Sequence, residues 1–259
     1  MRRLKYDTDL TDEEWSNIEY LIPQAHEGGR PRSADMREII NAVRYLLRSG
    51  CAWRLLPHDL PPWQTVYGYF HRFLEDGTWD KLFVMLRERA RRLQGKNATP
   101  TVGIIDSQSV KTTDVGGVHG YDGGKKINGR KRHIVVDTMG FLLCVIVHSG
   151  AIQDRDGARL VLETLKALFP GLRVVFADGG YAGKLVQWVE NLKAFVLRII
   201  KRTDKGFKIL PKRWIVERTF GWFGKYRRLS KDYERRMDTS EAFIKLAMIH
   251  ILLQRIRRT

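Results

Sequence analysis

The spacing of apolar residues changes near residue 100, and this change constrains the fold more than any other feature of the sequence. Before it, apolar side chains recur every three or four positions, as they do from Ile39 to Leu47, which is typical of amphipathic helices. After it, short runs of β-branched residues alternate with helical patterns. The sequence therefore predicts an all-helical domain at residues 1–93, a polar linker at 94–101 and an α/β domain at 102–259.

The N-terminal part carries signals for short helices separated by turns. Glu14 follows Thr11 by three residues, which is a capping-box signature. Apolar residues on one face predict another helix from Trp63 to Phe73. Its outer face would present Gln64, Thr65, Tyr67, His71 and Arg72. Such a helix suits a helix-turn-helix unit that reads DNA; the alternative is a helical cap that only stabilises the rest of the protein.

The α/β part predicts a mixed sheet of five strands, at residues 101–106, 131–138, 141–150, 172–178 and 194–200. Helices are predicted at residues 155–168, 181–191, 213–229 and 240–257. Met139 and Gly140 form a hairpin signal between the second and third strands. The segment 112–133 contains six glycines and few apolar residues, which predicts a long loop that is functional or disordered.

The charge of the chain indicates a polyanionic partner. The formal net charge is +17 and the sequence pI is about 10.1, and neutralising phosphates with such an excess of cations releases condensed counterions. The sequence contains no run of about 18 apolar residues, so no membrane span is expected. The N-terminus lacks the apolar stretch of a secretion signal, which predicts a cytosolic protein. Cys51 and Cys144 are expected to be reduced, buried thiols.

Three acidic residues stand apart from the other carboxylates. Asp106 and Asp178 each end a predicted strand, and Glu217 lies on a predicted helix crowded with Arg and Lys. Carboxylates gathered at strand ends can hold two divalent ions that activate a nucleophile and stabilise a leaving oxygen, and Mg²⁺ prefers such oxygen ligands. Any one of them alone has an ordinary alternative, since Asp178 before two glycines is also a good turn residue.

Basic residues surround these acids in the sequence. Between Arg198 and Arg236 there are fourteen Lys and Arg against four Asp and Glu, a composition suited to positioning a phosphate backbone. The candidate DNA contacts in the α/β part are Arg213, Arg218, Lys225, Lys125, Lys126, Arg130 and Arg132. Trp222 and Tyr226 could stack on a splayed base, although aromatic residues at this spacing more often pack into a core.

The three acids stand in the segments GIIDSQSVK, FADGGYAG and RWIVERTFGWFGKYRRLSKDYE. These segments resemble the three signature regions of the catalytic domain of the DDE transposases of bacterial insertion sequences, in the insertion-sequence-four and -five superfamily and on its insertion-sequence-five side. LTDEEWSNIEYLIP and PPWQTVYGYFHRF are similar to the family's N-terminal domain. The resemblance covers nearly the whole chain. One signature of the wider superfamily, Tyr-Arg-Glu-Lys, is only partly met, because Leu210 and Gly224 stand at its tyrosine and lysine positions.

The resemblance implies a ribonuclease H-like catalytic domain in which Asp106, Asp178 and Glu217 are the catalytic triad and hold two Mg²⁺, with Mn²⁺ as a substitute. It implies cleavage of transposon ends in double-stranded DNA and joining of the 3′-hydroxyls to target DNA by a homodimer. It also implies a bacterial protein associated with the nucleoid, without a small-molecule cofactor. Two rivals remain: a nuclease of this fold that cuts but does not join, and a transposase-derived DNA-binding protein that has lost catalysis.

Overall fold

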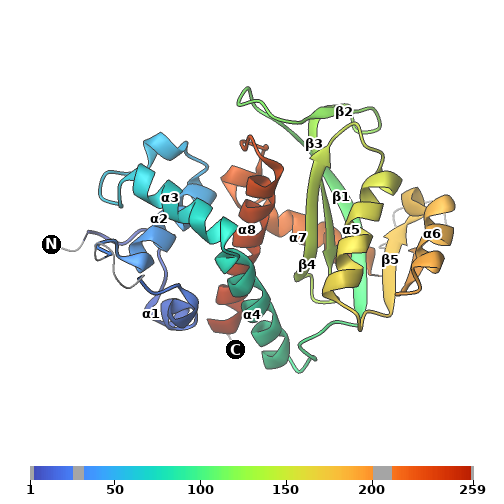
Figure 1. The fold of residues 1–259 in the computed structure, drawn as a ribbon, viewed down its shortest axis with the longest axis horizontal. Helices are drawn as coiled ribbons and strands as arrows, with labels where there is room; N and C mark the ends of the chain where they lie inside the picture. The colour runs from blue at the N-terminus through green and yellow to red at the C-terminus, as the bar shows by residue number, and fades with distance from the viewer. Residues whose placement is uncertain (1–2, 26–31, 201–211, 258–259) are drawn as a thin grey trace.

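The computed structural model describes residues 3–25, 32–200 and 212–257 (Figure 1). The N-terminal part is helical, as the sequence predicts. Its helices are α1 (Asp12–Ser16), α2 (Met36–Ser49), α3 (Trp63–Glu75) and α4 (Thr78–Leu93), with single 3₁₀ turns η1 (Glu19–Leu21) and η2 (Trp53–Leu55). The predicted capping box is confirmed at α1. There the Thr11 Oγ1 accepts from the Glu14 N–H at 3.1 Å, and the Glu14 carboxylate accepts from the Thr11 N–H at 3.3 Å.

The second part is built on a mixed sheet. Its strands are β1 (Val102–Lys111), β2 (Gly120–Asp122), β3 (Ile127–Val136), β4 (Leu142–Ser149), β5 (Val174–Asp178) and β6 (Val196–Ile200). The long strands lie in the order β4-β3-β1-β5-β6, and the short β2 pairs with the start of β3. β1 is antiparallel to β3 and parallel to β5, which is parallel to β6. The predicted mixed α/β sheet is therefore confirmed, with β2 as an additional strand.

Helices cover both faces of this sheet (Figure 1). On one face, α5 (Asp154–Leu168) and α6 (Lys184–Leu192) enclose a core that includes Ile105 and Val135. The other face carries Ile104 and Ile134 and packs against α7 (Arg213–Phe223) and α8 (Met237–Arg257). Two single 3₁₀ turns, η3 (Gly179–Tyr181) and η4 (Arg227–Leu229), follow β5 and α7. Within the described ranges, no helix combines the length and apolarity needed to cross a bilayer.

The last helix, α8, joins the two parts of the chain. Figure 1 shows it between the N-terminal helices and the sheet, and it contacts both α4 and β4. Buried side chains lie all around it, which is the pattern of a helix enclosed by protein. Because α8 contributes to the same apolar cluster as Leu10 and Ile134, the N-terminal helices and one face of the sheet share a continuous core.

Three predicted elements differ from the structure. β1 runs five residues beyond Asp106, because Ser107 to Lys111 continue the antiparallel pairing with β3. The predicted loop 112–133 instead contains β2 and the first half of β3, and its glycines serve close packing: a Cβ on Gly129 would lie 1.9 Å from the Val110 carbonyl oxygen. The helix predicted at 213–229 ends at Phe223 and is followed by η4.

His250, on α8, makes the stability of this fold depend on pH. Burial, together with the charges of Arg44, Arg48 and Arg257, lowers its pKa to about 3. The unfolded histidine titrates near 6.5, so the unfolded chain binds the proton first as the pH falls. The folded pKa is the lower one, and the stability that neutral His250 contributes is therefore present above about pH 6.5 and is lost below it.

We expect the free energy of unfolding to fall between pH 7.5 and pH 5.0 by about 2 kcal/mol more in the wild-type protein than in His250→Gln. Glutamine does not titrate and can still reach Gln254, which lies 3.1 Å from the His250 Nε2. Urea unfolding at both pH values measures the difference. Equal losses in the two proteins would show that His250 is not the group responsible.

Candidate active site

The strand register places Asp106 beside Asp178. β1 and β5 are parallel, with Val102 opposite Val174 and Ile104 opposite Phe176. Continuing this register by two residues pairs Asp106 with Asp178, and partner positions on adjacent parallel strands point to the same face of a sheet. Asp178 ends β5, as predicted, whereas Asp106 lies within β1 at the point where its pairing with β5 has stopped. Both carboxylates are partly buried.

Glu217 reaches the same place from α7 through an arginine. The Arg213 Nη2 lies 3.3 Å from the Asp178 Oδ2, and the Arg213 Nε lies 3.1 Å from the Glu217 Oε1. The second contact is an ion pair without hydrogen-bond geometry, since the Arg213 Nε has no hydrogen-bond partner. Arg213 and Glu217 are four residues apart and therefore share one face of α7. One guanidinium thus bridges the second and third acids.

The electrostatics of Asp106 show that the acids influence one another. Burial raises the pKa of Asp106 to about 6, and the negative charge of Asp178 adds to this effect. A hydrogen bond from the Ser107 N–H, at 2.7 Å, and the charges of Arg213 and Lys125 act in the opposite direction. A cation placed between Asp106 and Asp178 would relieve both the repulsion and the cost of burying the charge.

A polar network on the opposite face of β1 holds this strand in place, and the sequence reading missed it. The Ser107 hydroxyl donates to Asp154 at 3.0 Å, and the Lys131 Nζ lies 3.0 Å from the same carboxylate. The Lys125 Nζ donates to the Ser107 carbonyl oxygen at 3.0 Å. Asp154 is the first residue of α5, and it also fixes the residue that follows Asp106.

A second buried network holds the turn after Asp178. The Tyr181 hydroxyl lies 3.1 Å from the His133 Nε2, and the His133 Nδ1 lies 2.7 Å from the His148 Nε2. Burial lowers the pKa of both histidines, and the nearby Lys131 contributes in the same direction. Two neutral rings therefore connect the turn after β5 with β3 and β4. In the sequence, the one indication of this network is that Tyr181 lies three residues after Asp178.

The three acids offer donors that suit a hard divalent cation. In the described ranges, no three Asp, Glu, His or Cys side chains converge as ligands of one ion, and the Arg213 guanidinium lies against Asp178 and Glu217. The donor set is nevertheless all carboxylate oxygen, and the raised pKa of Asp106 marks a buried carboxylate next to a second negative charge. These residues fit Mg²⁺, and Mn²⁺ shares the same preference for oxygen ligands.

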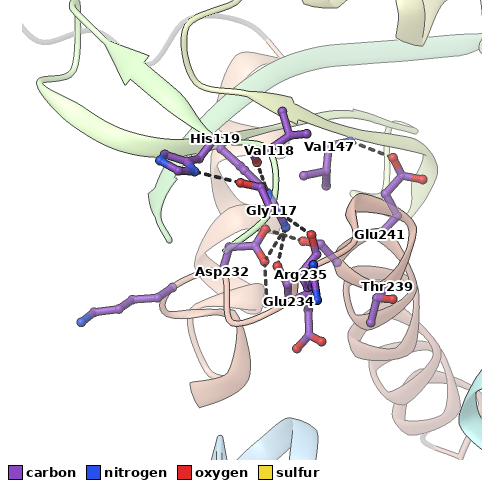
Figure 2. A network of polar contacts seen from close by, with 12 residues as sticks. Gly117, Val118, His119, Val147, Asp232, Glu234, Arg235, Thr239 and Glu241 are labelled. Atoms are coloured by element: carbon purple, nitrogen blue, oxygen red, sulfur yellow. Dashed lines mark hydrogen bonds and ion pairs between the residues drawn. The ribbon is translucent and has the colours of Figure 1, made fainter. Parts of the chain in front are cut away.

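Two of the predicted DNA contacts are instead buried structural residues. Arg130 is 0% exposed, and its guanidinium donates to the Val118, Glu234 and Arg235 carbonyls and pairs with Asp232 at 3.2 Å. Figure 2 shows Asp232, Glu234 and Arg235 gathered beside Gly117 and Val118, so this network ties the loop before β2 to the segment before α8. Arg132 is buried as well and donates to the Leu229 and Lys231 carbonyls. Neither guanidinium can reach DNA in this fold.

Arg218 is also engaged within the protein. It lies over the rings of Trp214 and Trp222, at 4.6 and 4.7 Å, and donates to the Met139 carbonyl at 2.7 Å. The side chain therefore stacks along α7 rather than projecting into solvent. Tyr226 is 3% exposed and belongs to the core, so it is not available to stack on a base.

The other predicted DNA contacts are accessible to solvent but lie in different parts of the fold. Lys125 and Lys126 are exposed on the turn between β2 and β3, and Lys125 is close enough to lower the pKa of Asp106. Lys225 lines a cleft of about 610 Å³ between the N-terminal segment, α2, and the ends of α7 and α8. Gln64 and Arg72 are exposed and Thr65 is half-exposed on α3, which Figure 1 shows on the far side of α8 from the sheet. Residues 201–211, part of the predicted basic belt, lie outside the described ranges.

Comparison with known proteins gives four matches. A family model described as "Transposase DDE domain" matches residues 97–252, and one described as "Putative transposase of IS4/5 family" matches residues 10–83. The chain is 34% identical over 141 residues to the "Putative transposase for insertion sequence element IS402" of Burkholderia cepacia, covering 50% of this chain and 65% of that protein. It is 30% identical over 81 residues to the "Uncharacterized protein y4sN" of Sinorhizobium fredii, covering 31% of this chain and 65% of that protein. The chain thus spans slightly less than two thirds of the length of these relatives.

Proposed function

Because this chain belongs to the DDE transposases of the IS4/5 type, we propose that it binds the terminal inverted repeats of an insertion sequence, hydrolyses a phosphodiester at each end and joins the freed 3′-hydroxyls to target DNA. The observation that carries this proposal is the register that sets Asp106 beside Asp178, together with the Arg213 bridge from Asp178 to Glu217. In this proposal, one acid from each of β1 and β5 of the ribonuclease H-like sheet and one from the helix α7 would face the same phosphate.

Asp106, Asp178 and Glu217 are the proposed catalytic residues and the proposed ligands of two Mg²⁺, with Mn²⁺ as an alternative. When bound, such ions supply a deprotonated attacking oxygen and stabilise the leaving oxygen. The protein's proposed contribution is position: the register of the paired strands would hold Asp106 and Asp178 at one level, and Arg213 links Glu217 on α7 to Asp178. The buried networks behind Ser107 and Tyr181 keep both strands from shifting.

The basic residues near the acids have a second proposed role. Arg213 offsets the charge of Asp178 and Glu217 in the free protein, and a phosphate that enters the site is an alternative partner for the same guanidinium. Lys125 and Lys126 lie on the exposed turn beside β1 and suit contacts to the phosphates flanking the scissile bond. Lys225 continues the basic surface beyond the end of α7.

The α3 helix is the proposed reader of the transposon ends, with Gln64, Thr65 and Arg72 toward DNA. Cleavage at two ends of one element requires two active sites, so we propose that a homodimer assembles on the DNA. Activity on chromosomal DNA places the protein in the bacterial cytoplasm, at the nucleoid.

Replacing Arg72 by Ala should weaken binding to end DNA about five- to tenfold near physiological salt and lower the slope of log affinity against log salt by about 1. Arg72 is exposed and lies over the Tyr69 ring at 5.1 Å, so its removal should leave the fold intact. Lys166→Ala removes one charge from an exposed position on α5 and serves as the matched control. Equal affinities for the two variants would exclude α3 as the reading helix.

A strand-transfer assay tests the proposed function as a whole. Duplexes copied from the two borders of the gene, already cut at the 3′ ends, are incubated with supercoiled plasmid and either Mg²⁺ or Mn²⁺. We expect the labelled ends to become covalently joined to the plasmid, which only a transposase would do. A protein that cuts uncut borders but never joins the precut ones is a nuclease, and this outcome would overturn the proposal.

A further inference from the structure

Three glycines lie inside the α-helices of the described ranges, and the fold explains only one of them. Gly157 on α5 packs against His148, since an added Cβ would lie 2.2 Å from the His148 Nε2. Gly68 on α3 and Gly221 on α7 are exposed, and an added Cβ would meet no atom within 4 Å at either position. Neither has a positive φ that would exclude a side chain.

Glycine at such positions is unfavourable for the protein on its own. It loses more backbone entropy on folding than any other residue and is the poorest helix former after proline. Alanine would fit at Gly68 and Gly221 without strain or contact. Each helix is therefore less stable with glycine than it would be with alanine, and no contact within the protein requires the glycine. A molecule that approaches the helix backbone too closely for a Cβ would require it.

The neighbours of both glycines indicate what that molecule is. Gly68 lies between Gln64 and Arg72 at spacings of four residues, so the three share one exposed stripe of α3. Gly221 lies in the last turn of α7, four residues after Glu217 and four residues before Lys225, which lies just beyond the end of the helix. Each stripe ends in a cation, and the chain carries a net charge of +17, which suits a phosphate backbone rather than a basic or apolar partner.

We propose that Gly68 and Gly221 are the two positions where DNA lies directly against a helix backbone, at the transposon end for α3 and beside the scissile phosphate for α7. This inference rests on the proposed function and adds the path that the DNA follows across the protein surface. At 1.5 Å per residue, Gly221 lies about 6 Å along the axis of α7 from Glu217, close to two base-pair steps of duplex. A strand that runs along α7 from Glu217 toward Lys225 would therefore pass Gly221.

Alanine at each glycine gives a distinctive test, because protein stability and DNA function should move in opposite directions. Gly68→Ala and Gly221→Ala should each raise the Tm of the DNA-free protein, by about 2 °C. Gly68→Ala should weaken binding of a duplex copied from the gene borders about tenfold, with normal single-turnover cleavage once the DNA is saturated. Gly221→Ala should bind within about threefold of wild type but cleave the saturated DNA at least about tenfold more slowly.

Thr164→Ala is the matched control, since it raises helix propensity on α5, on the face of the sheet opposite to α7, where the Thr164 hydroxyl donates to the Leu160 carbonyl of the same helix. It should change neither binding nor cleavage. If both glycine variants gain stability while binding and cleavage stay at wild-type values, the inference is overturned and the proposed function stands. Altered dimerisation in size-exclusion chromatography with unchanged DNA binding would assign the stripes to a second copy of the chain and also overturn it. Absence of cleavage by the wild-type protein would instead remove the proposed function.

Discussion

Asp106→Asn, Asp178→Asn and Glu217→Gln should each reduce cleavage of border DNA by at least about a thousandfold while leaving end binding within about threefold of wild type. Each substitution keeps the size of the side chain and removes one negative charge. Losing a carboxylate ligand removes several kcal/mol of transition-state stabilisation from a divalent-metal site, which corresponds to about three powers of ten in rate. Binding should persist because α3 lies on the far side of α8 from the sheet (Figure 1), whose strands β1 and β5 carry Asp106 and Asp178.

The measurement is single-turnover cleavage of a labelled border duplex with Mg²⁺, repeated with Mn²⁺. Glu163→Gln on the exposed face of α5 makes the same chemical change away from the site and should cleave normally. Near-normal cleavage by any of the three variants removes that residue from the catalytic set. Loss of end binding along with cleavage would point to misfolding, which a melting curve of each variant detects.

Arg130→Met should lower the Tm by about 10 °C, because breaking a fully buried ion pair costs about 3–5 kcal/mol. Both Arg130 and Asp232 have side chains that are 0% exposed. Removing the guanidinium leaves the Asp232 charge buried, where the Ser240 hydroxyl and the Glu234 N–H remain as hydrogen-bond donors, at 2.7 and 3.1 Å. It also leaves the Glu234 and Arg235 carbonyls without their donor.

Arg236→Met is the control for this prediction, because Arg236 pairs with Asp238 at an exposed position in the same segment. Its Tm should change by less than about 2 °C. Adding Asp232→Leu to Arg130→Met should recover part of the lost stability, since both charges are then absent. If Arg130→Met melts like the wild type and binds DNA more weakly, Arg130 is a DNA contact, as the sequence predicts.

The elements that the sequence predicts well depend on short-range signals. The capping box at Thr11, the hairpin at Gly140 and the end of β5 at Asp178 each follow from residues within a few positions of one another. The continuation of β1 beyond Asp106 was missed because it depends on pairing with β3, whose partner residues lie 18 to 26 positions away in the chain. Polar residues such as Ser107 and Ser109 carry no apolar signal for that strand.

The basic residues show the limit of sequence reading most clearly. Arg130 and Arg132 stand in a glycine-rich, cationic segment that is typical of an exposed DNA-binding loop. The groups that bury them, at Asp232, Leu229 and Lys231, lie about a hundred residues further along. Nothing in the local sequence distinguishes an arginine that meets phosphate from one that meets backbone carbonyls.

The sequence alone determines that this protein is a DDE transposase with a helical part, an α/β part and three isolated acids. It can do so because helix and strand periodicity and the signature segments are encoded locally. Only the tertiary structure decides that Asp106 and Asp178 share a register, that Arg213 joins Asp178 to Glu217, and that α8 unites the two parts in one core. Those outcomes depend on burial and on partners distant in the chain, which no short window of sequence contains.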